Sequence, residues 1–121
     1  MNQCRLVMPS HLNSYGVLFG GYMLLWVDEV SWIAASRDYP GCRFVTVGMD
    51  RVEFKKSVGA GEVLDFRTKS ERVGTTSVTY RVTVMRQSLD SATADEVFDT
   101  RVTLVRIDGD GNKTPLPFAE F

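Results

Sequence analysis

Hydrophobic and polar positions alternate with a period of two in the second half of the chain. Between residues 78 and 84, valine or tyrosine alternates with threonine or arginine, which is typical of a strand with one buried face. Segments of this kind, together with a short first one, predict strands at Gln3–Met8, Phe44–Phe54, Val63–Val73, Ser77–Gln87 and Val97–Ile107. Turn-forming or polar breaks separate the last four strands, at Val58–Gly61, Gly74–Thr76 and Asp90–Asp95.

The segment Gly20–Arg37 has a different character and predicts a long helix. It contains no proline, ends in an arginine that suits a helix C-terminus, and is followed by the breaker Tyr39-Pro40-Gly41. Because it is apolar on nearly every side, we expect other structure to wrap around it. One strand, one helix and four closely spaced strands predict a single α+β domain over residues 1–121, with the helix packed on an antiparallel sheet.

The composition excludes several classes of function. The chain has 121 residues, 14 Lys and Arg against 15 Asp and Glu, and a net charge of −1, which favours neither nucleic acid nor an anionic membrane as a partner. The longest apolar run, Tyr22–Val27, is far too short to cross a bilayer. Cys4, Cys42 and the lone His11 are too few for a structural zinc site or a disulfide framework. We therefore expect a cytoplasmic protein that holds no metal.

The strongest candidate for chemistry combines Gly20 and Gly21 with Asp28. Two glycines that open a helix leave its first N–H groups uncrowded, which suits a carbonyl oxygen that gains negative charge. Asp28 lies about two turns further along, on the same helical face as Gly21. A carboxylate in an apolar helix is costly unless it is partnered or functional, so the alternative is a partnered Asp on a partly buried helix. Asn13 could orient water or a carbonyl, or simply shape the turn before the helix.

Other polar residues carry weaker signals. Glu29 points about 100° away from Asp28 around the helix, which predicts an ion-pair role at most. His11 has no acidic or nucleophilic partner at a telling distance, so we expect a solvated loop side chain. Cys4 and Cys42 are expected to pack as small hydrophobic residues. The segment 108–112 starts like a calcium loop, but its twelfth position lacks the glutamate, so we expect a turn.

The segment MPSHLNSYGVLFGG at residues 8–21, followed by LLWVDEV at 24–30, resembles the hotdog-fold acyl-CoA thioesterases, and most closely their bacterial broad-range acyl-CoA hydrolase branch. That family has an Asn and a Gly ahead of a Gly-Gly pair, and an acidic residue two turns into the helix. The similarity continues downstream at residues 45–50, 54, 61–62, 73–77 and 105–117. The block departs from many relatives at His11, where they have Asp.

The resemblance implies a hotdog fold, in which an antiparallel β-sheet wraps around one long central helix. It also implies a homodimer with two active sites between the subunits, which often assembles further into tetramers or hexamers. Carried over residue by residue, Asp28 is the catalytic carboxylate, and the N–H groups at Gly20 and Gly21 polarise the thioester carbonyl. Asn13 matches the family's loop asparagine, which acts with the carboxylate of the other subunit.

The function that these residues favour is hydrolysis of acyl-CoA to a free acid and CoA, without a metal or bound cofactor. Asp28 acts as general base or, alternatively, as a nucleophile through an anhydride. We expect the CoA nucleotide outside the sheet, where Arg72 and the turn residues Gly74, Thr75, Thr76 and Ser77 offer a cation and hydrogen-bond donors. The alternative for this segment is a tight turn beside an exposed Arg.

Two other functions remain open on the same fold. A hydratase or dehydratase needs a catalytic His beside the acid, and the only His of the chain is His11. A non-catalytic acyl-CoA-binding module would merely tolerate Asp28.

Overall fold

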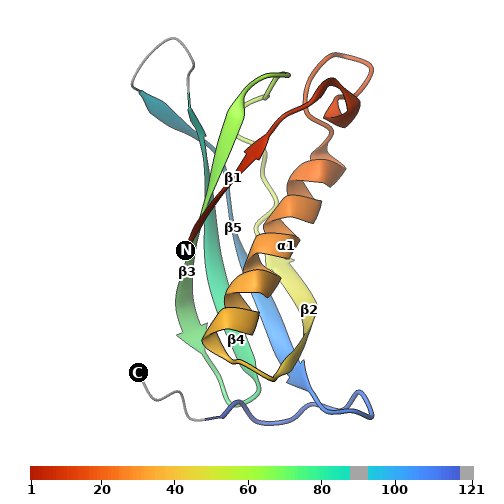
Figure 1. Cartoon of the computed structure of the whole chain (residues 1–121), viewed down its shortest axis with the longest axis vertical. Coiled ribbons are helices and arrows are strands. Elements are labelled where there is room, and N and C mark those ends of the chain that lie inside the picture. Colours follow the sequence, from red (N-terminus) through yellow and green to blue (C-terminus); the bar gives the residue numbers. More distant parts are fainter. Residues whose placement is uncertain (88–92, 118–121) are drawn as a thin grey trace.

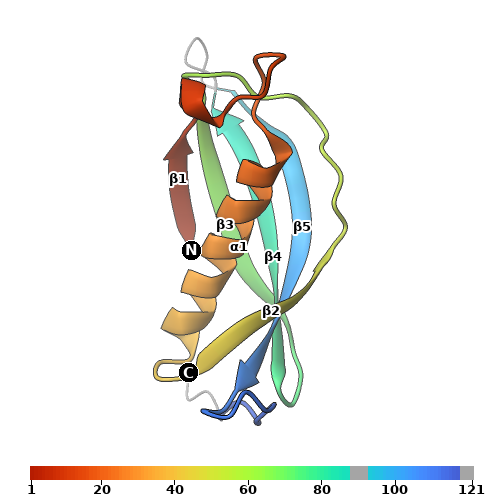
Figure 2. The same cartoon turned by 90° about the vertical axis from the view of Figure 1, so that its right-hand side faces the viewer.

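The computed structural model describes residues 1–87 and 93–117, and its strands form one antiparallel sheet that curls around a single helix (Figures 1 and 2). The strand order is β1-β3-β4-β5-β2. The elements are β1 (Asn2–Leu6), a 3₁₀ turn (Pro9–His11), α1 (Gly20–Asp38), β2 (Arg43–Asp50), β3 (Val63–Val73), β4 (Ser77–Gln87) and β5 (Ala94–Ile107). The expected α+β hotdog architecture is confirmed.

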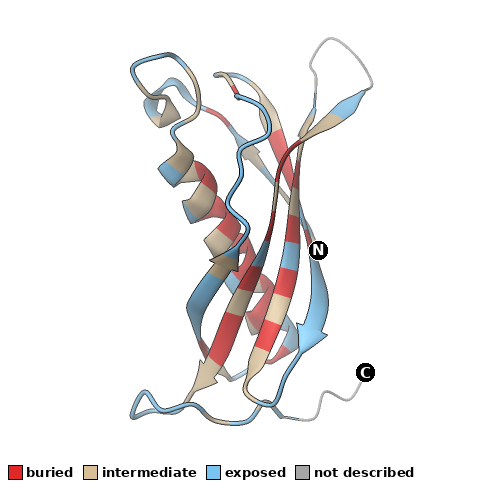
Figure 3. Cartoon of the chain, turned by 180° about the vertical axis from the view of Figure 1, so that it is seen from behind, coloured by how far each residue is buried: buried red, intermediate tan, exposed pale blue. Residues whose placement is uncertain are grey.

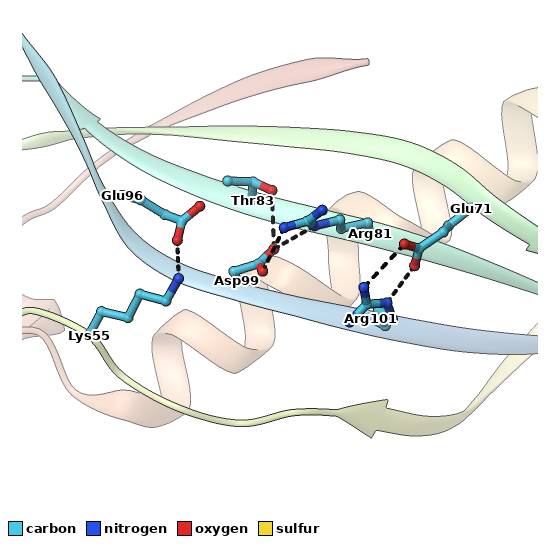
Figure 4. Close-up of polar contacts among 7 residues, drawn as sticks. All are labelled: Lys55, Glu71, Arg81, Thr83, Glu96, Asp99 and Arg101. Atoms are coloured by element: carbon cyan, nitrogen blue, oxygen red, sulfur yellow. Dashed lines mark hydrogen bonds and ion pairs between the residues drawn. The ribbon is translucent and has the colours of Figure 1, made fainter.

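The alternation along β4 determines which face of the sheet meets the helix. Its valines and Tyr80 are buried on the helix side, while Arg81 and Thr83 face outward. Figure 3 shows buried positions alternating with less buried ones along the strands. The outer face is covered by ion pairs between neighbouring strands, including Arg81–Asp99 (Figure 4). Arg101 donates two hydrogen bonds to Glu71, which hold the pKa of that carboxyl below its ordinary value.

The helix α1 packs on the sheet through one continuous stripe. Its buried residues recur at intervals of three and four, as expected for one helical face. They are Met23, Trp26, Val27, Val30, Ser31, Ala34 and Ala35. On the opposite side Leu25 and Trp32 remain 51% and 49% exposed. The expectation of a helix wrapped on all sides therefore fails for a single chain, because one curled sheet covers only one side of it.

Three strand ends differ from the sequence prediction by two residues or more. β1 ends at Leu6, and β2 ends at Asp50 after an irregularity between Thr46 and Gly48. Beyond β2, Phe54 forms only an isolated bridge to Phe98. β5 begins at Ala94, within the expected polar break, because Asp95 pairs across the strands with Arg86. The rest of that break, residues 90–92, lies outside the described residues.

Candidate functional site

The start of α1 presents free backbone donors. Phe19 is the N-cap and supplies no side-chain hydrogen bond, and within residues 1–87 and 93–117 no acceptor is recorded for the N–H groups of Gly20 and Gly21. A Cβ at Gly21 would lie 2.6 Å from a ring carbon of Phe19, and one at Gly20 would lie 3.0 Å from the Phe54 ring. The two glycines therefore let aromatic rings pack against the helix start while its N–H groups stay open.

The carboxylate of Asp28 is oriented by a side chain from β2. Asp28 is partly exposed, and its Oδ1 accepts a hydrogen bond of 2.5 Å from the Oγ1 of Thr46. Its Oδ2 has no recorded partner among the described residues. The carboxylate lines an open pocket of about 350 Å³ together with Glu29, Trp32 and Ile33. One oxygen is thus anchored, and the other remains available to accept a proton.

Sequence reasoning did not identify Thr46. Its residue type is ordinary in a strand, and 18 positions separate it from Asp28, so no local spacing links the two. Only the docking of β2 beside α1 brings them together. Thr46 faces the helix because its register partner on β5, Leu104, is a buried residue of the same sheet face.

Asn13 shapes the loop that leads into α1. Its Oδ1 accepts hydrogen bonds from the N–H groups of Tyr15 at 2.9 Å and Val17 at 3.3 Å. This is the turn-forming role that the sequence left open. The Nδ2 group has no acceptor in the described part of the chain, so it remains a free donor beside the helix start.

The glycines and Asp28 of one chain lie far apart along the helix axis. Seven to eight residues of α-helix separate them, which corresponds to about 10–12 Å along the axis. A base, its water and the attacked carbonyl must lie in successive contact at about 3 Å each. The helix start and the carboxylate of one chain therefore lie at, or beyond, the limit of such an arrangement.

Two expectations for isolated polar residues are wrong. His11 is not a solvated side chain, because its Nδ1 accepts a hydrogen bond from the Met8 N–H and its ring packs 4.8 Å from Tyr22 and 4.9 Å from Trp26. Cys4 does not pack in the interior, because it lies exposed on an edge strand. His11 is held because its ring belongs to an aromatic cluster at the start of α1. Cys4 is exposed because it lies on the outward face of β1.

The expectations for Cys42 and for the segment 108–112 hold, while the ion pair considered for Glu29 does not form among the described residues. Cys42 is partly buried and packs against the core. Glu29 is exposed, and no ion pair is recorded for it among the described residues. The segment 108–112 is a turn, because Asp108 accepts hydrogen bonds from the N–H groups of Asp110 and Asn112.

The turn between β3 and β4 is tied into the fold. The N–H of Gly74 donates to the carbonyl of Ser77 at 2.8 Å. The carbonyl of Thr75 accepts from the N–H of Leu116 near the end of the described chain, and that of Thr76 accepts from the N–H of Arg106 on β5. Arg72 is exposed and has no ion-pair partner in the described ranges. The backbone here serves the turn, while the Arg72 guanidinium remains a free cation.

The described residues offer neither a metal site nor a membrane-spanning helix. No group of three His, Cys, Asp or Glu side chains within the described ranges could hold a metal ion. Among the described residues, no helix combines the length and the apolar character that crossing a membrane requires.

Comparison with known proteins places this arrangement in a family. The sequence pattern of the thioesterase superfamily matches residues 15–93, more than half of the chain. This chain belongs to the thioesterase superfamily. The acyl-CoA thioester hydrolase YciA of Salmonella typhimurium is 30% identical over 115 residues, which cover 93% of this chain and 86% of that protein.

Some relatives are longer than this chain. The uncharacterized acyl-CoA thioester hydrolase YkhA of Bacillus subtilis is 30% identical over 113 residues, which cover 92% of this chain but 64% of that protein. The chain thus spans less than two thirds of the length of this relative.

Solved thioesterases share the fold. Cj0915, a hexameric hotdog fold thioesterase of Campylobacter jejuni, superposes with a TM-score of 0.86 at 36% identity, covering 95% of this chain and 88% of that one. An acyl-CoA hydrolase of Staphylococcus aureus in complex with butyryl coenzyme A has a TM-score of 0.89 at 26% identity, covering 97% and 71%. Two mutants of the Staphylococcus aureus hydrolase replace one asparagine and one aspartate by alanine. These two positions are 15 residues apart, as Asn13 and Asp28 are in this chain.

Proposed function

We propose that this chain hydrolyses acyl-CoA thioesters to a free acid and coenzyme A, with Asp28 as general base. The observation that carries the proposal is that one helix, α1, bears both open N–H groups at its start and a carboxylate that Thr46 holds by one oxygen. Membership of the thioesterase superfamily and the names of relatives such as YciA support it.

The reaction follows from these groups. The free Oδ2 of Asp28 takes a proton from water, and the water oxygen adds to the thioester carbon. The N–H groups of Gly20 and Gly21 donate to the oxygen that becomes negative, which lowers the barrier because the donors are already in place. The intermediate then expels the CoA thiolate, which receives the proton from Asp28. The proposed reaction needs no metal or bound cofactor, and nucleophilic attack by Asp28 is its alternative first step.

We place each site between two copies of the chain. The spacing along α1 separates the glycines from the carboxylate of the same chain, so a second chain supplies the Asp28 that faces one helix start. The half-exposed Leu25 and Trp32 beside Asp28, and Val47 on the edge strand β2, form an apolar face that a second copy would cover. Asn13 then donates from its loop to water or substrate at the partner's carboxylate. Similar structures described as hexameric support this assembly.

The CoA nucleotide is proposed to lie outside the sheet near the β3–β4 turn. Arg72, which has no ion-pair partner among the described residues, supplies a cation for a phosphate, and the hydroxyls of Thr75, Thr76 and Ser77 supply donors. Gly74 lets the turn close tightly, because a Cβ there would lie 2.8 Å from the Ser77 hydroxyl oxygen.

The test compares Asp28→Asn with Glu29→Gln in a thiol-release assay on a panel of acyl-CoA esters. Asp28→Asn keeps the volume and removes the base, so turnover is expected to fall about 10²–10⁴-fold while the fold and CoA-ester binding persist. Glu29→Gln makes the same change on an exposed position and should stay within a few-fold of wild type. Near-full activity of Asp28→Asn would refute the assignment.

The same panel separates the other two functions. A hydratase would convert crotonyl-CoA without thiol release, and a binding module would bind CoA esters without turnover. Either result would replace the proposed hydrolase.

A further inference from the structure

A cavity of about 460 Å³ opens beside the first residue of α1. Its walls come from residues 17–18 of the preceding loop, from Gly20 and Met23 of the helix, and from segment 54–58 between β2 and β3. This volume lies in the range of small-ligand sites. The reaction described above assigns it no role.

The position of the cavity relates it to the proposed chemistry. Gly20 both lines the cavity and carries one of the N–H groups that receive the thioester oxygen. The carbonyl carbon bears its acyl chain and its sulfur on different sides. An acyl group held at Gly20 therefore has this cavity next to it, while the CoA portion leaves in another direction.

The lining suits a hydrocarbon chain. Its apolar members are Val17, Leu18, Met23, Phe54 and Val58. The two lysines of the lining are engaged elsewhere, since Lys55 pairs with Glu96 (Figure 4) and the Nζ of Lys56 lies 2.9 Å from Asp95. Their charges are thus neutralised on the β5 side, which disfavours an anionic occupant.

The ring of Phe54 lies against the start of the helix. A Cβ on Gly20 would lie 3.0 Å from its Cζ, and its ring packs 5.1 Å from the ring of the fully buried Phe98. The Lys55 N–H donates to the Val97 carbonyl at 3.0 Å, which anchors the backbone beside the ring. Phe54 nevertheless remains 49% exposed. A firmly placed aromatic ring that is half open on a cavity wall gains from being covered by an apolar ligand.

We propose that this cavity receives the acyl chain of the substrate and that the Phe54 ring sets the chain length that fits. The inference rests on the proposed thioesterase function and adds its chain-length specificity. Each methylene that enters the cavity should raise kcat/KM about threefold to fourfold, until the chain reaches the end of the space.

The experiment measures kcat/KM for saturated straight-chain esters from acetyl-CoA to palmitoyl-CoA. Wild type should rise to a maximum and then fall. Phe54→Ala should move the maximum to longer chains, and Phe54→Trp to shorter ones. Val52→Ala is the matched control, because Val52 is 48% exposed in the same segment and does not line the cavity. Its maximum should coincide with that of wild type.

Binding of S-alkyl-CoA thioethers, which have no carbonyl to attack, separates this inference from the proposed function. If wild type hydrolyses nothing but the preferred alkyl length moves with Phe54, the cavity assignment holds and the thioesterase proposal fails. If wild type hydrolyses acyl-CoA and the Phe54 variants keep its maximum, the cavity assignment is overturned alone. Absence of both hydrolysis and binding overturns both. If the circular dichroism spectrum of Phe54→Ala shows that this variant does not fold, the chain-length maxima of Phe54→Leu and Phe54→Trp test the cavity assignment instead.

Discussion

At the scale of single residues, the proposed chemistry depends on the carboxylate of Asp28, whose two oxygens have different surroundings. Thr46 donates to Oδ1 of Asp28, and hydrogen bonds to an ionised acceptor are short and strong. This bond limits the rotation of the carboxylate and leaves Oδ2 without a recorded partner among the described residues. In the proposed reaction Thr46 is a positioning residue, since it acts through Asp28 and not on the substrate.

Replacing Thr46 by valine keeps the shape and removes the donor. We expect kcat to fall about 10- to 100-fold, the equivalent of losing one hydrogen bond to a charged group, with little change in KM. Thr46→Ser retains the hydroxyl and should recover most of the activity. Steady-state kinetics with a good acyl-CoA substrate measure both. A wild-type kcat for Thr46→Val would show that Asp28 needs no such support.

At the scale of elements, the far end of α1 is tied to the sheet by a buried tyrosine. The hydroxyl of Tyr80 on β4 donates to Oδ2 of Asp38 in the last turn of α1 at 2.7 Å. Burial of the ring, and then the hydrogen bond and charge of Asp38, raise the pKa of Tyr80 far above its ordinary value. Folding therefore favours the protonated phenol. Its stabilisation is complete below the unfolded pKa of about 10 and is lost as the pH rises beyond it.

Tyr80→Phe should accordingly lower the free energy of unfolding by about 1–2 kcal/mol at pH 7. The gap to wild type should shrink at about pH 10.5–11, where the unfolded wild-type chain gains from ionising this tyrosine. Urea denaturation at both pH values measures the gap. Tyr39→Phe is the control for the hydrogen bond at pH 7, because Tyr39 is also buried but its hydroxyl has no recorded partner among the described residues. A gap that is the same at both pH values would contradict the assignment.

At the scale of the whole molecule, a single chain leaves its helix partly uncovered. The side of α1 that carries Leu25, Asp28 and Trp32 faces away from the buried stripe, and β2 leaves an open sheet edge with Val47 56% exposed. Apolar surface and an unpaired edge together favour association. A shared site between chains would make assembly and activity inseparable.

We therefore expect wild type to sediment as an even multiple of the 13.6 kDa chain. Trp32→Glu places a charge on the apolar face and should yield smaller species with reduced hydrolysis. Leu6→Glu changes a similarly exposed side chain, 52% accessible, on the opposite edge of the sheet, and it should leave the two-chain unit intact. A well-folded, active monomer in sedimentation would exclude the shared site.

Much of the architecture was already present in the sequence. The bounds of β3 and β4 agree with the predicted strands, and α1 exceeds its prediction only by Asp38. These succeed because side-chain periodicity along one element reports directly on which face is buried. The sequence likewise predicted the role of the Gly20-Gly21 pair, since two glycines at a helix start leave the nearby backbone N–H groups uncrowded.

Tertiary structure alone decided the contacts between elements that are distant in the chain. The bond from Thr46 to Asp28, the aromatic packing of His11 and the ring of Phe54 beside Gly20 depend on how β2 and the following segment dock against α1. The sequence also could not show that one side of α1 is uncovered in a single chain. A helix that is apolar on all sides has the same sequence pattern whether its own sheet or a second chain covers it. Local spacing carries no information about docking, so these features follow only from the folded chain.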